Sequence, residues 1–255
     1  MDRLNSNASR WTFAVIAHVG LVVAWYLFVE LGNVPKFVMP SPQATLNALL
    51  NPSYGWWSNI AVTGTEIFGG YLLALGVGVL LALVFTWSHT LEALFLPLLV
   101  TLNMIPKVAL GPLIIVWFKY GVFPNTLMAF SIAVFPILLT TARGLREIEP
   151  ELLDLVRSLR GSRWQLFTKI QLPGALPYIF SGMKVASILA VAGAVVGEFL
   201  GSDRGLGYLM LQVQVTLDTP AMFMAVLLIT LIGMLLYGMV LLLERLLVVR
   251  DARVA

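Results

Sequence analysis

The basic residue most able to do chemistry lies inside a long apolar stretch of the sequence. Lys107 directly follows Pro106 and comes four residues after Asn103. A charged side chain at the centre of a transmembrane helix costs about 2.5–3.5 kcal/mol on insertion scales, so each such residue is a candidate site. A cation beside a proline-broken helix can attract an anionic solute. We therefore predict that Asn103, Pro106 and Lys107 line a solute pathway.

Two carboxylates in apolar stretches extend this prediction and leave alternatives open. Glu198 is added to the predicted pathway, although Glu66 and Glu198 both lie toward the outer ends of their spans, where an interfacial or subunit-contact role is also expected. Lys107 can instead snorkel to the membrane surface, or pair with one of the two carboxylates. Together the three charges could also form the ion relay of a self-sufficient secondary transporter or channel.

The sequence holds no group that indicates catalysis by this chain. It has no cysteine and only two histidines, which argues against thiol chemistry, disulfides and zinc sites. It has no Gly-x-x-x-x-Gly-Lys-Ser/Thr phosphate-binding loop. The net charge of +3 is too small and too dispersed for a nucleic-acid partner. We expect no enzyme activity, no metal and no cofactor bound by this chain.

The composition predicts an integral membrane protein. Of its 255 residues 59% are hydrophobic and 11% are charged, whereas soluble domains have about 25% charged residues. Crossing a bilayer takes about 20 apolar residues. One membrane domain is expected over residues 11–248, flanked by residues 1–10 and 249–255. Its six predicted transmembrane helices lie at about residues 11–31, 61–87, 91–118, 122–142, 176–200 and 219–243.

Prolines predict a kinked helix in this arrangement, and basic residues predict its orientation in the membrane. Pro97, Pro106 and Pro112 fall in the third span and predict a kinked helix there. Residues 1–10, 143–169 and 244–255 together hold eleven Lys and Arg, whereas the opposite loops hold three. Because basic loops stay on the cytoplasmic side, both termini and the long loop are predicted to be cytoplasmic.

The long loop between the fourth and fifth spans predicts two short amphipathic helices. Apolar residues recur at helical spacing from Leu152 to Leu159, Gly161 is expected to end this helix, and Ser162 can cap a second one that Pro173 stops. Trp164 and Phe167 near the bend would form an apolar knob with arginines around it. Such a knob suits a groove in a partner protein, and equally an anionic lipid surface. The residues in question are Asp154, Arg157, Leu159, Arg160, Gly161, Ser162, Arg163, Trp164, Phe167 and Pro173.

This loop resembles the EAA loop of the permease subunits of bacterial ABC importers. In that motif Glu-Ala-Ala is followed at fixed distances by a glycine, an isoleucine and a Leu-Pro pair. Counting back from Ile170, Leu172 and Pro173 places residues 154–156 at the Glu-Ala-Ala positions and Arg160 at the glycine, with Gly161 one residue later. Three further segments resemble the nitrate, sulfonate and taurine branch of these permeases: Phe37–Pro42, Ile105–Phe118 and Gly197–Tyr208.

The resemblance implies an all-α integral membrane fold of six transmembrane helices, the type I ABC importer permease kind, with a cytoplasmic coupling-helix loop. It implies an inner-membrane subunit that works by alternating access. It also implies two copies of an ATP-binding subunit, which would carry ATP and Mg, and a periplasmic or lipid-anchored solute-binding protein. The solute would be small and anionic, such as nitrate, a sulfonate or taurine, or a related organic compound.

A stripe of small residues in the fifth span offers a close-packing face. Small side chains at helical spacing let two helices approach closely. The resemblance implies that this face is the seam with a second permease copy, and a contact within the chain is the alternative. The residues are Ala186, Ala190, Gly193 and Gly197.

Overall fold

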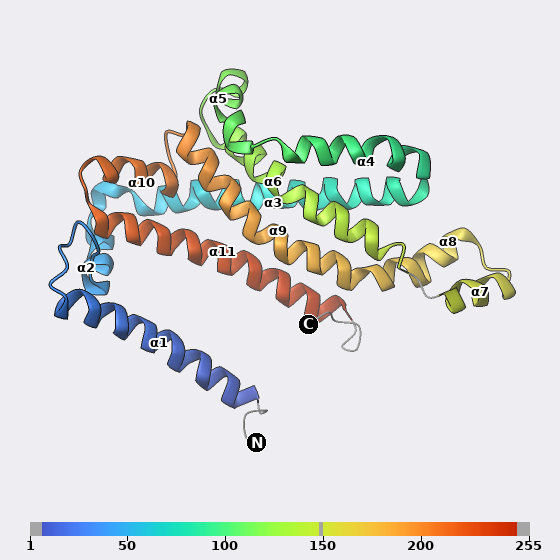
Figure 1. Ribbon diagram of the computed structural model, residues 1–255, viewed down its shortest axis with the longest axis horizontal. Coiled ribbons are helices and arrows are strands. Elements are labelled where there is room, and N and C mark those ends of the chain that lie inside the picture. The colour runs from blue at the N-terminus through green and yellow to red at the C-terminus, as the bar shows by residue number, and fades with distance from the viewer. Residues whose placement is uncertain (1–6, 148–149, 249–255) are drawn as a thin grey trace. The chain divides into compact units, whose positions relative to one another are not determined.

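The computed structural model describes residues 7–147 and 150–248, and all regular structure within them is helical (Figure 1). The all-α prediction is confirmed. The longer elements are α1 (Asn7–Leu31), α3 (Trp56–Trp87), α4 (His89–Met104), α5 (Lys107–Phe118), α6 (Val122–Gly144), α9 (Leu172–Gly201) and α11 (Thr219–Leu247). The shorter ones are α2 (Pro42–Asn47), η1 (Ala48–Leu50), η2 (Pro52–Tyr54), α7 (Pro150–Ser158), α8 (Arg163–Leu166), η3 (Phe167–Gln171) and α10 (Leu206–Val215).

The membrane-spanning helices follow the predicted order. Four helical stretches in the described part of the chain are long and apolar enough to cross a membrane, and these contain α3, α6, α9 and α11. The pair α4 and α5 meets the same requirement together. The apolar part of α1, Val15–Leu31, is shorter, so the first of the six spans stays a prediction.

The predicted kink in the third span is confirmed as a sharp break. Helices α4 and α5 are bent by 85° relative to each other, and the break falls at Ile105 and Pro106. Ile105 has an extended backbone with ψ of 126°, because the ring of a following proline disfavours the helical conformation in the preceding residue. Pro97 and Pro112 lie inside α4 and α5 without ending them.

The expectation that Pro173 stops the second loop helix is wrong. The helical stretch runs without interruption from Arg163 to Gly201, and Pro173 stands at the start of α9. A π-helical turn, η3, immediately precedes it. Proline has no N–H to donate and clashes with the carbonyl of the preceding turn. The wider π turn accommodates the ring, so the helix continues.

The small-residue face of α9 packs against α6 within the chain, so the predicted dimer seam is wrong for this face. All four of its residues are buried. A Cβ atom built on Gly193 would lie 2.6 Å from the Ala129 Cα atom of α6, and one on Gly197 would lie 3.0 Å from the Asn125 Cα atom. The glycines are therefore needed for close approach of two helices of the same chain.

The described residues form two compact units. The first contains the described residues up to Trp56 together with Leu209–Leu228. Within it the Trp25 indole donates to the Pro40 carbonyl at 3.0 Å, and Ser41 caps α2. The Thr219 hydroxyl donates to the Phe37 carbonyl at 2.7 Å. The segment Phe37–Pro42 is thus built into this unit by hydrogen bonds.

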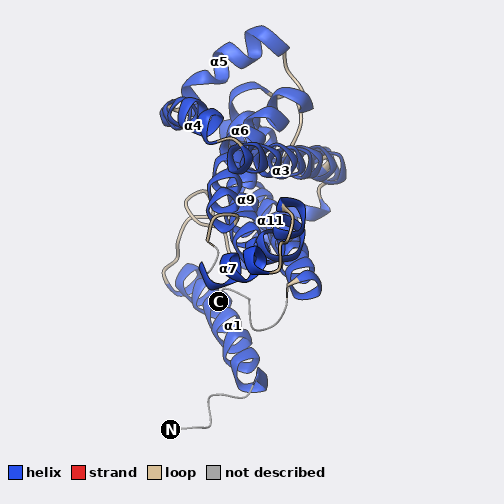
Figure 2. Cartoon of the chain, turned by 90° about the vertical axis from the view of Figure 1, so that its right-hand side faces the viewer, coloured by secondary structure: helices blue, strands red, loops and turns tan. Residues whose placement is uncertain are grey.

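The second unit contains Trp57–Tyr208 and the described residues from Ile229 onward. Figure 2 shows the helices α3, α4 and α6 of this unit. At one end of the unit they share an apolar cluster centred on Ala82, Phe85 and Leu138. Leu96 and Leu99 of α4 pack against that cluster. We call this end, from which the α7 and α8 segment departs, the loop end.

We expect Gly193→Ala to lower stability and Gly174→Ala to preserve it. The first change pushes a methyl group into the backbone of α6, and overpacking of this kind costs about 1–3 kcal/mol. Gly174 lies on the same helix with no atom within 4 Å of an added Cβ, so alanine there should be neutral or stabilising by up to about 1 kcal/mol. Thermal unfolding of the detergent-solubilised protein measures both. Equal effects would contradict the close α6–α9 contact.

Candidate functional site

The bend of the long loop is fixed by a helix-ending motif at Leu159, Arg160 and Gly161. The Gly161 N–H donates to the Val156 carbonyl at 2.8 Å, and Arg160 adopts a left-handed conformation with φ of +52°. This is the Schellman arrangement, in which the residue after the helix cap turns left-handed and the next N–H reaches back to the last turn. Glycine usually takes the left-handed position because other residues pay a steric cost.

The motif gives Arg160 and Gly161 different roles at the bend. Arg160, which the resemblance places at the EAA glycine position, adopts the left-handed conformation that suits a glycine. Gly161 has a different reason to be small. A Cβ atom there would lie 2.6 Å from the Val156 Cγ1 atom and 3.2 Å from the Val156 carbonyl oxygen. The absence of a side chain at Gly161 therefore allows the bend to pack closely against Val156 of α7.

The second loop helix begins as predicted at Ser162. The Ser162 hydroxyl accepts from the Gln165 N–H at 3.2 Å, and the Gln165 side chain accepts from the Ser162 N–H at 2.8 Å. This reciprocal pair is a capping box, which satisfies two backbone donors that the first turn of a helix leaves free. The cap fixes the direction in which α8 leaves the bend.

Two apolar side chains project from this bend and one does not. Leu159 is 73% exposed and Trp164 is 66% exposed. Phe167, predicted to be part of the same knob, is buried and lies edge-on to Trp87 of α3 at 5.5 Å between ring centroids. That part of the prediction is wrong because α8 continues into α9, which turns Phe167 toward the bundle. Asp154, Arg160 and Arg163 are exposed; the side chain of Arg157 lies outside the described part.

The break between α4 and α5 opens on a cavity of about 400 Å³. The three predicted pathway residues Asn103, Pro106 and Lys107 all line it, with α6 and α9 supplying other walls. The Lys107 ammonium donates to the Asn103 carbonyl at 2.8 Å and to the Asn103 side-chain oxygen at 3.2 Å. The last carbonyls of a helix have no partner within the helix, and here the lysine provides one.

Glu198 lies in another part of the second unit. Its carboxylate accepts from the Thr63 hydroxyl at 2.5 Å and from the Gly207 N–H, and the Thr63 oxygen accepts from the Leu206 N–H at 2.8 Å. The carboxylate therefore ties α3 and α9 to the first residues of α10. Glu198 is not among the described residues that line the cavity at the break, so its place in the solute pathway stays a prediction.

Glu66 completes this second cluster. It is fully buried and accepts from the Asn125 side-chain amide at 2.8 Å. Lys107 therefore has different partners from the two carboxylates, and no ion pair joins it to either of them among the described residues. Thr63 and Asn125 are buried polar residues that the sequence reading missed. The sequence signal that could have found them is that each is a polar residue within an otherwise apolar span.

These features define a class of protein: a helical membrane protein with a bent helix beside a cavity and one capped, amphipathic loop. A solved structure of the methionine ABC transporter MetNI, in an inward-facing form, supports the same fold. The likeness has a TM-score of 0.53 at 22% identity and covers 73% of this chain and 93% of that chain. The predicted fold class is confirmed by this match.

The family model for the binding-protein-dependent transport system inner membrane component matches residues 74–249, and the chain belongs to this family. It is 37% identical to an ABC transporter permease protein of Haemophilus influenzae, over 85% of this chain and 89% of that one. It is also 37% identical to a riboflavin transport permease of Chloroflexus aurantiacus (89% and 86% covered). An aliphatic sulfonates transport permease of Escherichia coli is 31% identical (89% and 88% covered).

The chain is accordingly a non-catalytic permease subunit of an ABC importer in the inner membrane, and the alternative of a self-sufficient transporter is not favoured. Its family implies an ATPase and a solute-binding protein as partners. ATP hydrolysis belongs to a separate subunit of such a system. The resemblance to the sulfonate branch is confirmed by the relatives.

We expect Arg160→Gly and Gly161→Ala to change the stability of the bend in opposite directions. Glycine removes the cost of the left-handed arginine, a gain of about 0.5–1 kcal/mol after the added chain entropy. Alanine at 161 brings a methyl group against Val156 and costs about 1 kcal/mol or more. Amide hydrogen exchange over Leu155–Leu159 should slow in the first variant and accelerate in the second. Faster exchange in both would refute the assigned motif.

Proposed function

We propose that the capped bend, Leu159–Trp164, is the coupling segment that docks into the ATPase subunit. The complete importer would contain two copies of this permease, two ATPase subunits that bind ATP and Mg, and a periplasmic or lipid-anchored solute-binding protein. Both termini and the bend face the cytoplasm. This orientation is supported by the eleven basic residues on that side against three on the other.

The docking proposal rests on one observation: the apolar side chains at the bend are exposed, while the backbone that carries them is held in place by hydrogen bonds. Leu159 and Trp164 expose large apolar surfaces on a bend held by the Schellman hydrogen bond and the capping box. A rigid exposed anchor loses little conformational entropy on binding. Arg160 and Arg163 are exposed on either side of Gly161, which suits a partner cleft with acidic residues at its rim.

We expect Trp164→Asp to abolish co-purification with the ATPase subunit while membrane insertion persists. An aspartate cannot fill an apolar pocket, and central aromatic anchors typically carry about 2 kcal/mol or more of binding free energy. Trp57→Asp is the matched control, because Trp57 is also a highly exposed tryptophan but lies outside the loop. Retained ATPase binding in Trp164→Asp, with lost binding to anionic lipid vesicles, would favour the lipid-contact alternative.

We also propose that the cavity at the α4–α5 break is part of the solute pathway. The cavity is lined by an amide, a proline and a cation from a broken helix, and irregular backbone at membrane depth is tolerated where it lines a cavity. The positive charge of Lys107 favours a small anionic solute. The sulfonate relative is consistent with that solute class, and the riboflavin relative supports a second candidate, a larger heteroaromatic solute.

We expect Lys107→Gln to reduce uptake of a sulfonate by about tenfold or more, since hydrogen bonds to charged groups contribute about 1.5–3 kcal/mol. Lys107→Arg keeps the charge and the donors for the α4 carbonyls, and should retain most of the activity. Uptake of radiolabelled alkanesulfonate and riboflavin by the assembled complex is measured in proteoliposomes. Equal losses for both solutes in Lys107→Gln would indicate a purely structural capping role.

A further inference from the structure

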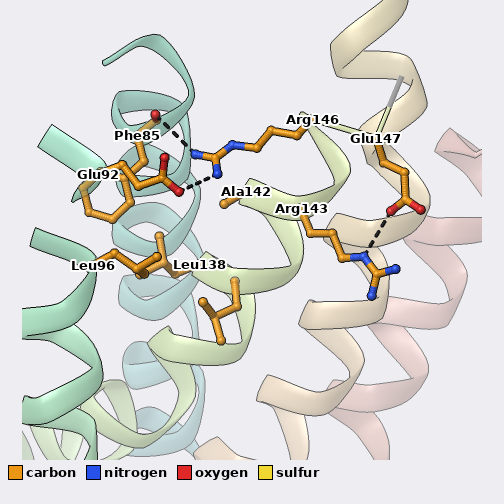
Figure 3. A pocket seen from close by; sticks show the side chains of 9 residues that line it. Phe85, Glu92, Leu96, Leu138, Ala142, Arg143, Arg146 and Glu147 are labelled. Carbon is orange, nitrogen blue, oxygen red and sulfur yellow. Dashed lines mark hydrogen bonds and ion pairs between the residues drawn. The ribbon is translucent and has the colours of Figure 1, made fainter. Parts of the chain in front are cut away.

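The entrance to the long loop is fastened to the two preceding helices by one arginine. Arg146 follows the end of α6 by two residues, and its guanidinium forms an ion pair with the Glu92 carboxylate of α4 (Figure 3). The second terminal nitrogen of Arg146 donates to the Phe85 carbonyl of α3 at 3.5 Å. The other Glu92 oxygen lies 3.2 Å from the His89 ring nitrogen. Three helices thus meet at one guanidinium.

The electrostatics of the two helix ends match these charges. Phe85 belongs to the last turn of α3, where carbonyl groups without helical partners concentrate negative partial charge. Glu92 belongs to the first turn of α4, where free N–H groups concentrate positive partial charge. An arginine against the first end and a carboxylate at the second are both stabilised. The Arg146–Glu92 pair therefore holds the α3–α4 turn as well as the loop.

Burial distinguishes this ion pair from a neighbouring one. The Glu92 side chain is 10% exposed and that of Arg146 is 43% exposed, whereas Arg143 and Glu147 are 73% and 48% exposed. The Arg143–Glu147 pair lies four residues apart along the chain, and exposed pairs of this kind contribute little. Figure 3 shows both pairs at the rim of one cleft of about 400 Å³. Across that cleft, the Arg146–Glu92 pair links the α6 end directly to α4.

Two further contacts hold the carboxyl-terminal end of the loop against the ends of α3 and α6. Phe167 packs edge-on against Trp87 at the end of α3, and the Gln171 side-chain amide donates to the Leu145 carbonyl at 3.3 Å. From Glu92, the partner of Arg146, helix α4 runs 13 residues to the break at Ile105, about 20 Å at 1.5 Å per residue. A continuous path of hydrogen bonds and helix connects the docking bend with the cavity.

We propose that Arg146 and Glu92 are positioning residues that transmit movement of the docked loop to α4 and thereby to the α4–α5 break. This inference rests on the proposed docking of Leu159–Trp164 to the ATPase. Energetic coupling between distant sites can be carried by salt bridges, hydrogen bonds and rigid helices. The ion pair supplies it at the point where the loop leaves the bundle, and α4 carries the displacement to the residues beside Lys107.

The test compares Glu92→Gln and Arg146→Gln with Glu147→Gln in the complete importer. We expect the first two variants to co-purify with the ATPase and to move about tenfold less solute per ATP hydrolysed, within the usual range of coupling between sites. Glu147→Gln removes the exposed pair and should keep the wild-type ratio. The double variant Glu92→Arg with Arg146→Glu should recover part of the ratio, because the pair is restored in reverse.

A second design separates mechanical linkage from charge. The chain has no cysteine, so Glu92→Cys with Arg146→Cys can be joined by a bifunctional thiol reagent. We expect the unlinked double variant to be uncoupled and the linked one to recover coupling. An unchanged ratio in both single variants, or loss of ATPase binding in them, would overturn the positioning role. A wild-type chain that fails to bind the ATPase would instead overturn the docking proposal.

Discussion

Hydrogen bonding of the backbone inside a bilayer is the constraint on which the rest of this structure depends. Lipid hydrocarbon offers no hydrogen bonds, so backbone groups freed at a helix break need partners from the protein or from a water-filled cavity. The carbonyl oxygens freed at the end of α4 receive the Lys107 ammonium. This local solution allows a bent helix to stand beside a cavity.

The long loop combines two requirements that pull in different directions. A docking segment has to be exposed, and a segment that transmits force has to be anchored. The chain divides these tasks between Trp164, which is exposed, and Phe167, which is buried against α3 three residues later. The Schellman turn and the capping box fix the backbone of the exposed bend, so Trp164 is held in a defined position as Phe167 is by its packing. Arg146 provides the second anchor at the loop entrance.

Patterns that act over a few residues were predictable. The proline before Lys107 located the break, and the serine before α8 located its cap, because both depend on local backbone chemistry. Predictions that depended on the neighbour of a helix face were wrong. The stripe around Gly193 indicated a close helix contact, but its partner proved to be α6 of the same chain. Glu198 was recognised as a special residue, but its partner Thr63 comes from α3, 135 residues away along the chain.

By itself the sequence determined that the chain spans a membrane, where its third span breaks and which loop carries the amphipathic bend. These properties follow from hydrophobicity, proline chemistry and local spacing, all of which are read along one segment. Only the tertiary structure decided which side chains meet: Arg146 with Glu92, Phe167 with Trp87, and the Glu198 carboxylate with the start of α10. Such contacts depend on how helices pack and rotate against one another, and helix periodicity alone does not specify the partner of a face.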